Sequence, residues 1–336
     1  MRRFLALTLI AVMAFGVVGL AQDLGTRNNP IKMVLVPSTH GEEILEIGEQ
    51  IAEALSGLTG YYIEAILQPD YAAMVETFAT SDGDVFGFPA SVQYLSIYNR
   101  TNGEASVRLA SVRYGATTYY AGLYVRRDSG MSSITDCAGK VWLATDELST
   151  SGNVIPQLVF DAWGIEPSEK IFTGSHGPAI TALVEGQGDF ATCYYTAPGA
   201  PADWTGANWA LGDDLERWLW DPYNNAPYPA AIRGSLRDVR VSIDDIYGEE
   251  TLLSEYKCIA LIGGEIPNDC VTFAPGFPQD MEDALVQAIK DHIATDEGVA
   301  LWNDDKFYEW TEVAEIDDSY YDTLRTAIGQ PIPDRD

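Results

Sequence analysis

The chain has 336 residues and is strongly acidic, with 50 Asp and Glu against 20 Lys and Arg and a formal net charge of −30 at pH 7. This charge excludes nucleic acid and anionic membrane surfaces as partners, because both would repel the chain. Hydrophobic residues make up 46% of the sequence, which predicts a globular protein, and the length suits two lobes better than one core.

The first 21 residues have the pattern of a secretory signal peptide. Arg2 and Arg3 precede an apolar run over residues 4–18, and Gly19 and Ala21 provide the small residues that a signal peptidase needs. The run is shorter than the ~20 residues of a membrane-spanning helix. We therefore expect cleavage after Ala21 and a mature protein in the periplasm or otherwise outside the cytoplasm.

The mature chain begins with alternating strands and helices. Apolar runs predict strands at residues 31–36, 61–67 and 84–88, and helical spacing predicts helices at 42–55, from Pro69 through Phe78, and after Pro89. This alternation is typical of an α/β sheet whose ligand contacts lie at the ends of the strands.

The same alternation starts again after a long strand-like run over residues 117–126. The second set comprises a strand at 141–144, a helix from Asn153, a strand at 170–172 and a helix from Ala179. The restart indicates a second lobe, joined to the first by a hinge.

The later part of the chain is expected to return to the first lobe. Residues 228–232 are a candidate strand for the crossing, and helices from Met281 and Asp296 would rejoin the first lobe. We therefore predict an α/β protein with lobe 1 at residues 22–126, lobe 2 at 127–230, and a return to lobe 1 over 231–336. Between the lobes we expect a hinged cleft.

Four cysteines in an exported chain predict disulfides. Cys258 and Cys270 are close enough in sequence to staple a hairpin, which leaves Cys137 to pair with Cys193. The connectivity stays open, because four cysteines allow three pairings. Zinc binding is the alternative, but the spacings contain no Cys-x-x-Cys or paired-His pattern, so we expect neither a metal nor another cofactor.

A run of hydroxyl side chains, Ser149-Thr150-Ser151-Gly152, stands between the predicted strand at 141–144 and the next helix. A helix start carries backbone N–H groups without an intrahelical partner and the positive end of the helix dipole. Hydroxyl donors at that place predict an anion site that needs no Lys or Arg. The alternative interpretation is an ordinary N-cap followed by a flexible glycine.

His176 stands at a second helix start, in Gly174-Ser175-His176-Gly177-Pro178, where Pro178 fits the first helical turn. From there the imidazole can offer an N–H to an anion. A lone histidine is more often a structural hydrogen-bonding residue, but its place about 25 residues after the hydroxyl run favours a role in binding.

Together with other stretches in the same order, these motifs resemble the phosphonate- and phosphite-binding periplasmic proteins that supply ABC importers. The other stretches are Pro69-Asp70-Tyr71-Ala72, Asp84-Val85, Tyr119-Tyr120 and Arg127-Asp128-Ser129. The resemblance extends to about Pro229. It implies the two-lobed type II periplasmic-binding-protein fold.

The resemblance also implies which residues form the site. The hydroxyls of Ser149, Thr150 and Ser151 and the imidazole of His176 would grip an oxyanion from lobe 2. Aromatic residues of lobe 1 would complete the cleft, and the positions that match are Tyr71, Tyr119 and Phe88, the last in place of a tyrosine.

The ligand that the resemblance implies is a small phosphorus oxyanion, such as phosphite, hypophosphite, methylphosphonate or phosphate. The acidic residues that hold the amine of aminoalkylphosphonates in this family are replaced here by Thr196 and Ala231, so 2-aminoethylphosphonate should be disfavoured. The implied partner is the membrane permease of an ABC importer, and we expect the binding protein to act as a monomer without catalytic activity.

Two alternatives remain open at this stage. Ser149 or Ser151 with His176 could form part of a hydrolase triad. The sequence has no Gly-x-Ser-x-Gly elbow, however, and it offers only two other histidines, His40 and His292, as a catalytic base. The same fold could also bind another small anion, such as a sulfonate, because fold does not fix the ligand.

Overall fold

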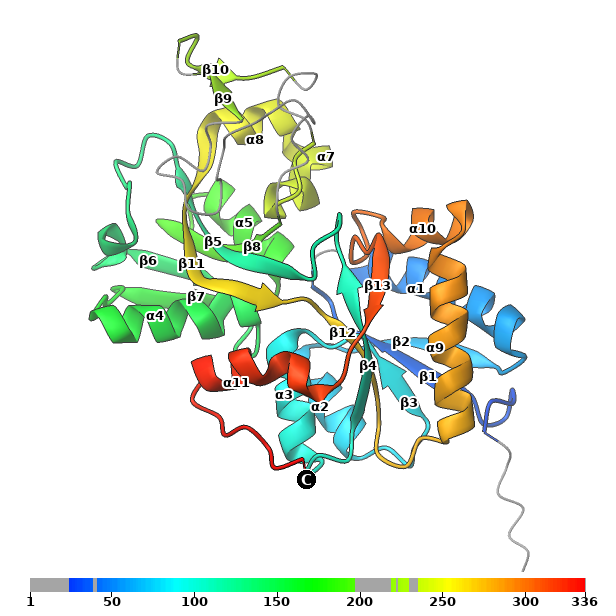
Figure 1. The fold of residues 1–336 in the computed structure, drawn as a ribbon. Coiled ribbons are helices and arrows are strands. Elements are labelled where there is room, and N and C mark those ends of the chain that lie inside the picture. Colours follow the sequence, from blue (N-terminus) through cyan, green and yellow to red (C-terminus); the bar gives the residue numbers. More distant parts are fainter. Residues whose placement is uncertain (1–23, 39–40, 197–218, 222, 230–234, 336) are drawn as a thin grey trace, which may run out of the picture.

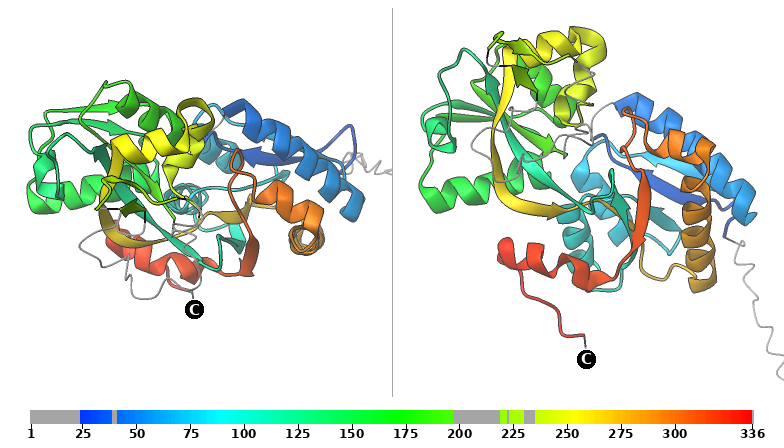
Figure 2. Two further views of the ribbon diagram at one scale, coloured as in Figure 1. Left: turned by 90° about the horizontal axis from the view of Figure 1, so that it is seen from above. Right: turned by 45° about the horizontal axis from the view of Figure 1, so that its top comes forward.

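The computed structural model describes residues 24–38, 41–196, 219–221, 223–229 and 235–335, which form two α/β lobes. The lobes lie side by side in all three views of the ribbon (Figure 1, Figure 2). This confirms the predicted two-lobed α/β class. The predicted signal peptide lies outside the described residues, and none of the described helices is long and apolar enough to cross a membrane.

The first lobe is built on a six-stranded sheet with the order β13-β4-β12-β3-β1-β2. Its parallel part contains β1 (Ile31–Leu35), β2 (Ile63–Leu67) and β3 (Val85–Gly87), and its antiparallel part contains β4 (Ser106–Val112), β12 (Cys270–Phe273) and β13 (Glu312–Glu315). The strands at 31–36, 61–67 and 84–88 were therefore predicted correctly to within two residues.

Helices α1 (Gly41–Thr59), α2 (Tyr71–Ala79), α3 (Ser91–Arg100), α9 (Gln279–Ile293) and α10 (Asp296–Trp302) belong to the same lobe. Ile44, Ile51 and Leu55 of α1 are fully buried at helical spacing, in one core with Leu285 and Ile289 of α9. The two C-terminal helices α9 and α10 thus pack with the first lobe.

The second lobe has a five-stranded sheet with the order β11-β5-β8-β6-β7. The strands are β5 (Thr118–Arg126), β6 (Val141–Ala144), β7 (Glu169–Phe172), β8 (Phe190–Tyr195) and β11 (Tyr256–Pro267). The helical segments are η1 (Ile134–Cys137), a π-helical turn η2 (Thr150–Val154), α4 (Ile155–Trp163), α5 (His176–Val184), η3 (Val239–Ile243), α7 (Asp244–Tyr247) and α8 (Glu249–Glu255).

The chain crosses between the sheets at other positions than the sequence indicated. Strand β5 pairs with β8 and β11 in the second sheet, so the first crossing lies at residues 113–117, before the 117–126 run. The return crossing lies at residues 268–269, between β11 and β12. A continuous apolar strand is buried on both faces in either sheet, so its composition does not show to which sheet it belongs.

The candidate crossing at 228–232 is not a strand between the lobes in its described part. The preceding residues form β10 (Ala226–Pro227), which pairs with β9 (Trp220–Asp221) in a separate two-stranded ribbon. Residues 230–234 lie outside the described part of the chain.

The predicted disulfides are not formed, because each of the four cysteines is a buried thiol. Cys258 lies in β11 of the second sheet and Cys270 in β12 of the first, so they flank a crossing and do not face each other across a hairpin. Cys137 and Cys193 belong to different core clusters. Burial raises the pKa of Cys193 well above its usual range, which keeps this thiol unreactive.

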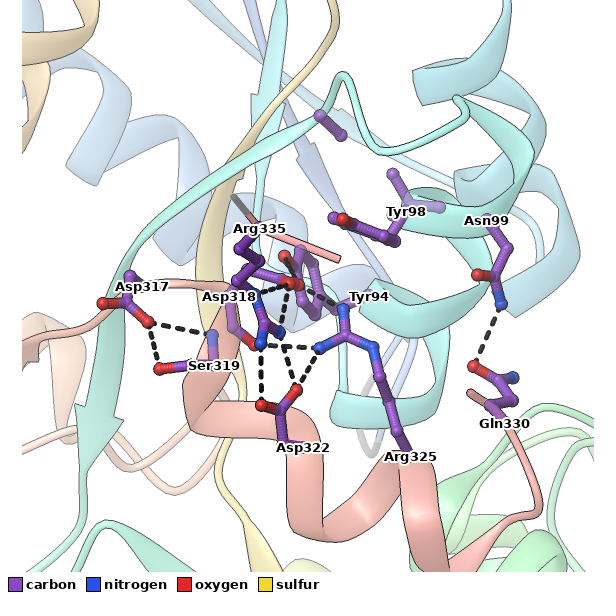
Figure 3. Close-up of polar contacts among 12 residues, drawn as sticks. Tyr94, Tyr98, Asn99, Asp317, Asp318, Ser319, Asp322, Arg325, Gln330 and Arg335 are labelled. Atoms are coloured by element: carbon purple, nitrogen blue, oxygen red, sulfur yellow. Dashed lines mark hydrogen bonds and ion pairs between the residues drawn. The ribbon is translucent and has the colours of Figure 1, made fainter. Parts of the chain in front are cut away.

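The C-terminal segment, with η4 (Asp318–Tyr321) and α11 (Asp322–Ala327), is fixed to α3 of the first lobe by a charged network (Figure 3). Arg325 and Arg335 both bind the carboxylates of Asp318 and Asp322, and the Tyr94 hydroxyl of α3 donates to Asp318 at 2.7 Å. Because Arg325 is buried and multiply paired, this network is a structural anchor.

Candidate functional site

A cavity lined by polar, charged and aromatic side chains lies between the two lobes, with a volume of about 60 Å³. Residues of both lobes and of both crossings line it: Val36, Ser38, Tyr71, Ala90, Arg113, Tyr119, Ser149, Thr150, His176, Tyr194, Thr196, Asp269, Asp305, Phe307, Tyr308 and Glu309. Five of the seven residues predicted for the site are in this set. Ser151 and Phe88 are not.

The hydroxyl run forms the start of a helix, as predicted, but in an unusual geometry. Residues Thr150–Val154 make a π-helical turn, and Ser149 caps it by accepting a hydrogen bond from the backbone N–H of Gly152 at 3.2 Å. A glycine is required at 152, because a Cβ there would lie 1.9 Å from Oγ1 of Thr145. The cap occupies the acceptor side of the Ser149 hydroxyl, so its proton is left to be donated elsewhere.

Thr150 and Ser151 have different surroundings. The Thr150 hydroxyl lines the cavity and accepts a hydrogen bond at 3.0 Å from the backbone N–H of Val92, at the start of α3 in the other lobe. The Ser151 hydroxyl is buried outside the cavity lining, next to the Tyr119 hydroxyl. The run therefore presents two hydroxyls to the cavity.

His176 is the first residue of α5, and Pro178 lies in the first turn as expected. Its Nε2 is 3.5 Å from the Ser149 hydroxyl, and its backbone N–H donates at 2.9 Å to the carbonyl of Ser38 in the first lobe. The ring packs edge-on against Tyr194, with centroids 5.2 Å apart. Nδ1 is buried and finds no hydrogen-bond partner in the part of the chain that the structure describes.

The electrostatic surroundings keep His176 neutral. Burial, and to a lesser degree the nearby Arg113 guanidinium, lower the pKa of His176 to about 3. A neutral imidazole has one N–H donor and one acceptor nitrogen. At neutral pH His176 therefore contributes a dipole and a hydrogen bond to the cavity without a charge.

Two predicted tyrosines line the cavity, Tyr71 from the first lobe and Tyr119 from the second. Tyr71 begins α2, whose N-cap Asp70 accepts a hydrogen bond from Ala73 N at 2.7 Å, and Tyr119 lies in β5 next to the crossing. Both side chains are buried and line the cavity. Burial raises the pKa of both hydroxyls above the usual range, so they remain protonated and can donate hydrogen bonds.

Phe88, which was expected in the cleft, does not line the cavity. It is 1% exposed and packs edge-on against Trp302 and Trp310, with ring centroids 5.4 and 5.0 Å away. Tyr308 is a third ring neighbour of Phe88 and itself lines the cavity. Phe88 is therefore a core residue behind the cavity wall.

Charged residues in the cavity were missed by the sequence analysis. Arg113 of the first crossing forms an ion pair with Asp269 of the return crossing and donates from Nε to the Tyr308 carbonyl at 2.8 Å. Asp305 and Glu309 come from the loop between α10 and β13. These residues belong to no contiguous motif. Arg113 and Asp269 could have been recognised as cavity residues only if the two crossings had been placed correctly.

The sequence also drew attention to four further residues, Thr196, Ala231, His40 and His292. Thr196 is buried and lines the cavity, while Ala231 and His40 lie outside the described residues. His292 is in α9 and accepts a hydrogen bond from the Trp302 indole at 3.1 Å, so it is a core residue. Within the described ranges, no group of three or more His, Cys, Asp or Glu side chains could hold a metal ion.

Two α/β lobes that enclose such a cavity, with two helix starts at its wall, define a solute-binding protein of the periplasmic type. Residues 33–321 match the family described as ABC transporter, phosphonate, periplasmic substrate-binding protein. The chain belongs to this family of transport proteins, whose function is to bind a substrate for an ABC transporter. Among curated proteins, no relative matches the sequence significantly.

Solved structures confirm the fold at low sequence identity. The binding protein component of an ABC phosphonate transporter from Pseudomonas aeruginosa is 18% identical with a TM-score of 0.65, over 88% of this chain and 84% of that chain. PhnD1 from Prochlorococcus marinus, in complex with methylphosphonate, is 15% identical with a TM-score of 0.63, over 88% and 96%. A Xanthomonas citri protein bound to ATP is 14% identical with a TM-score of 0.58, over 89% and 96%.

Proposed function

We propose that the protein captures a small phosphorus oxyanion between its lobes and delivers it to the membrane permease of an ABC importer. The ligand would be phosphite, hypophosphite, an alkylphosphonate or phosphate. The observation that carries this proposal is the meeting of the Ser149 and Thr150 hydroxyls, the His176 imidazole and the hydroxyls of Tyr71 and Tyr119 in one buried cavity. Hydrogen bonds from such donors to a charged oxygen are stronger than those between neutral groups.

The size of the cavity favours a small ligand. A buried water molecule needs about 10–15 Å³ of such space, so a volume of about 60 Å³ holds about four to six water-sized groups. Phosphite and methylphosphonate are of that size, whereas ATP is several times larger. The methylphosphonate bound to PhnD1 from Prochlorococcus marinus is thus a better guide to this cavity than the ATP bound to the Xanthomonas citri protein.

Contacts between the lobes favour a mechanism of closure around the ligand. Hydrogen bonds join the lobes at the cavity, among them Val92 N–H to the Thr150 hydroxyl and His176 N–H to the Ser38 carbonyl. Both involve residues of the proposed oxyanion site. A ligand that bridges the lobes would add to these bonds and shift the hinge toward the closed form, which a permease could then recognise.

Hydrolysis is disfavoured by the geometry around His176. In a Ser-His-acid triad, a carboxylate accepts a hydrogen bond from Nδ1 and orients the ring. Here Nδ1 has no partner among the described groups, and the Ser149 contact to Nε2 is 3.5 Å long. Because membership of a transport family points the same way, we propose binding without catalysis, by a monomer exported through its signal peptide.

The proposal is tested by calorimetric titration of the mature protein after unfolding and refolding to remove bound ligand. The panel is phosphite, hypophosphite, methylphosphonate, phosphate, 2-aminoethylphosphonate and sulfate. Micromolar or tighter binding of a phosphorus oxyanion, weakened by about tenfold or more in Ser149→Ala and in His176→Ala, is the expected result. Absence of binding to the whole panel, or binding that neither substitution weakens, would contradict it.

A further inference from the structure

The charges that line the cavity are unusual for an anion site. Arg113 supplies one positive charge, and it is already paired with Asp269. Asp305 and Glu309 supply two further carboxyl groups. If both were ionised, the cavity would repel an incoming anion, and the net charge of −30 of the whole chain would add to this repulsion.

Of these two carboxyl groups, Glu309 would repel a bound anion more strongly if it were ionised. Its side chain is about nine-tenths buried, whereas Asp305 is exposed to solvent, which screens its charge. Its backbone has φ 53°, a left-handed conformation that is uncommon for residues other than glycine. Such backbone conformations are held in place by surrounding structure and are frequent at functional sites.

The groups around Glu309 leave its carboxyl only weakly satisfied. The Tyr114 hydroxyl lies 3.5 Å from Oε1, at the limit of a hydrogen bond. Arg113 and Arg237 face it with positive charge, while Asp305 faces it with negative charge and Tyr194 lies close by. Arg113 is already engaged with Asp269 and the Tyr308 carbonyl, and Arg237 lies over the Tyr114 ring at 3.4 Å.

We propose that Glu309 is a specificity-determining residue of the cavity, and that its protonated carboxyl group donates a hydrogen bond to the bound oxyanion. The inference rests on the proposed function and names the chemistry of the same site. The proton comes from solvent, resides on a Glu309 oxygen and is shared with a ligand oxygen, and no covalent bond of the ligand changes. Each anion is thus bound together with one proton.

Two further observations agree with this arrangement. Burial raises the pKa of Glu309 to about 7, against the opposing effect of Arg113, so the proton is available near neutral pH before any anion binds. Elsewhere in the cavity lining, the buried Nδ1 of His176 lacks a partner among the described residues, and Ser149 has a proton to donate. An anion among these groups would receive donors from both lobes.

The test measures the affinity of the full-length mature protein and of Glu309→Gln for methylphosphonate and phosphite between pH 6 and pH 9. Gln keeps the size of the side chain and donates a hydrogen bond at every pH. The wild-type affinity should fall relative to that of the variant by up to about tenfold per pH unit above pH 7, because one proton is taken up with each anion. The ratio of the two affinities at each pH cancels the effect of the ligand's own ionisation.

Proton uptake is measured directly by calorimetry at pH 8 in two buffers with different heats of ionisation. The wild type should take up close to one proton more than Glu309→Gln for each anion bound. Glu312→Gln is the matched control, since it makes the same change at an exposed carboxylate three residues away that does not line the cavity, and it should leave the wild-type pH profile unchanged.

The outcomes separate this inference from the proposed function. Equal pH profiles and equal proton uptake in wild type and Glu309→Gln, with tight binding in both, would overturn the role of Glu309 alone. Tighter binding of 2-aminoethylphosphonate than of methylphosphonate, lost in Glu309→Gln and without proton uptake, would also overturn it, because the carboxylate would then bind an ammonium group. Failure of both proteins to bind any oxyanion would overturn the function itself.

Discussion

The second-lobe wall and the first-lobe wall of the cavity differ in chemistry and in the way the chain builds them. The second lobe contributes neutral donors, Ser149, Thr150 and His176, each at a helix start within a short contiguous motif. The first lobe and the crossings contribute charged residues, among them Arg113, Asp269 and Glu309, from segments far apart in the sequence. The neutral wall would hold any small oxyanion, and the charged wall would decide which one.

The largest effect is expected on the charged wall, from breaking the ion pair between the crossings. Arg113→Met leaves the Asp269 carboxylate without its partner in a site where both side chains are less than one-fifth exposed. We expect a loss of about 3 kcal/mol in the free energy of unfolding, measured by urea denaturation. The double variant Arg113→Met/Asp269→Asn should recover most of it, and an unchanged stability of the single variant would show that the pair is not structural.

On the neutral wall, Ser149→Ala should weaken oxyanion binding by about 10- to 100-fold, which corresponds to about 1.5–3 kcal/mol for a hydrogen bond to a charged group. Ser151→Ala is the comparison, because its hydroxyl lies outside the cavity lining and reaches the site only through the Tyr119 hydroxyl. It should weaken binding less than Ser149→Ala does, by about two- to fivefold. Titration calorimetry compares the two, and equal losses would remove the distinction between these neighbouring serines.

A similar loss of affinity is expected where the two walls meet. Thr150→Val keeps the shape of the side chain but removes both the hydroxyl proposed to bind the oxyanion and the acceptor for the Val92 N–H of the first lobe. The affinity should fall by about 10- to 100-fold, as in Ser149→Ala, and closure should also be weaker. Small-angle scattering with and without methylphosphonate provides the second measurement, and a variant that closes as fully as the wild type at equal ligand concentration would contradict it.

The smallest effect is expected on the pH dependence of stability, where His176 acts only below pH 6.5. Its pKa is lowered to about 3 in the folded protein, from a usual value of 6.5. The unfolded chain therefore binds the extra proton first, and the contribution of His176 to stability is complete above pH 6.5 and is lost as the pH falls toward 3. His176→Gln should flatten this part of the acid-denaturation profile, and an imidazole signal that titrates near pH 6.5 by NMR would contradict the buried neutral state.

The sequence was a good guide to local structure and to the neutral wall. Helix starts at residues 71 and 176 and the cap at Ser149 follow from local signals, because N-caps, Pro178 and apolar spacing act over a few residues. The family resemblance then related these segments to one site. Family membership and the two-lobed fold are confirmed by the match over residues 33–321.

What the sequence could not predict depends on tertiary pairing. The sheet to which β5 belongs is set by its neighbours β8 and β11, which come much later in the chain. Because the crossings were predicted at the wrong positions, Arg113 and Asp269 were not recognised as cavity residues. For the same reason a disulfide was predicted between Cys258 and Cys270, which lie in different sheets. Phe88 was assigned to the cleft by position in a motif, yet its ring packs among Trp302, Trp310 and Phe307.

The central claim, that two walls of different chemistry enclose one oxyanion, is tested most directly by a crystal structure of the protein with methylphosphonate. The account predicts the phosphonate oxygens within hydrogen-bond distance, about 3 Å, of the Ser149 and Thr150 hydroxyls and the His176 ring on one side. It predicts the Glu309 carboxyl at the same distance from a phosphonate oxygen on the other. A phosphonate bound outside the cavity, or inside it without contact to Ser149 and His176, would contradict the account.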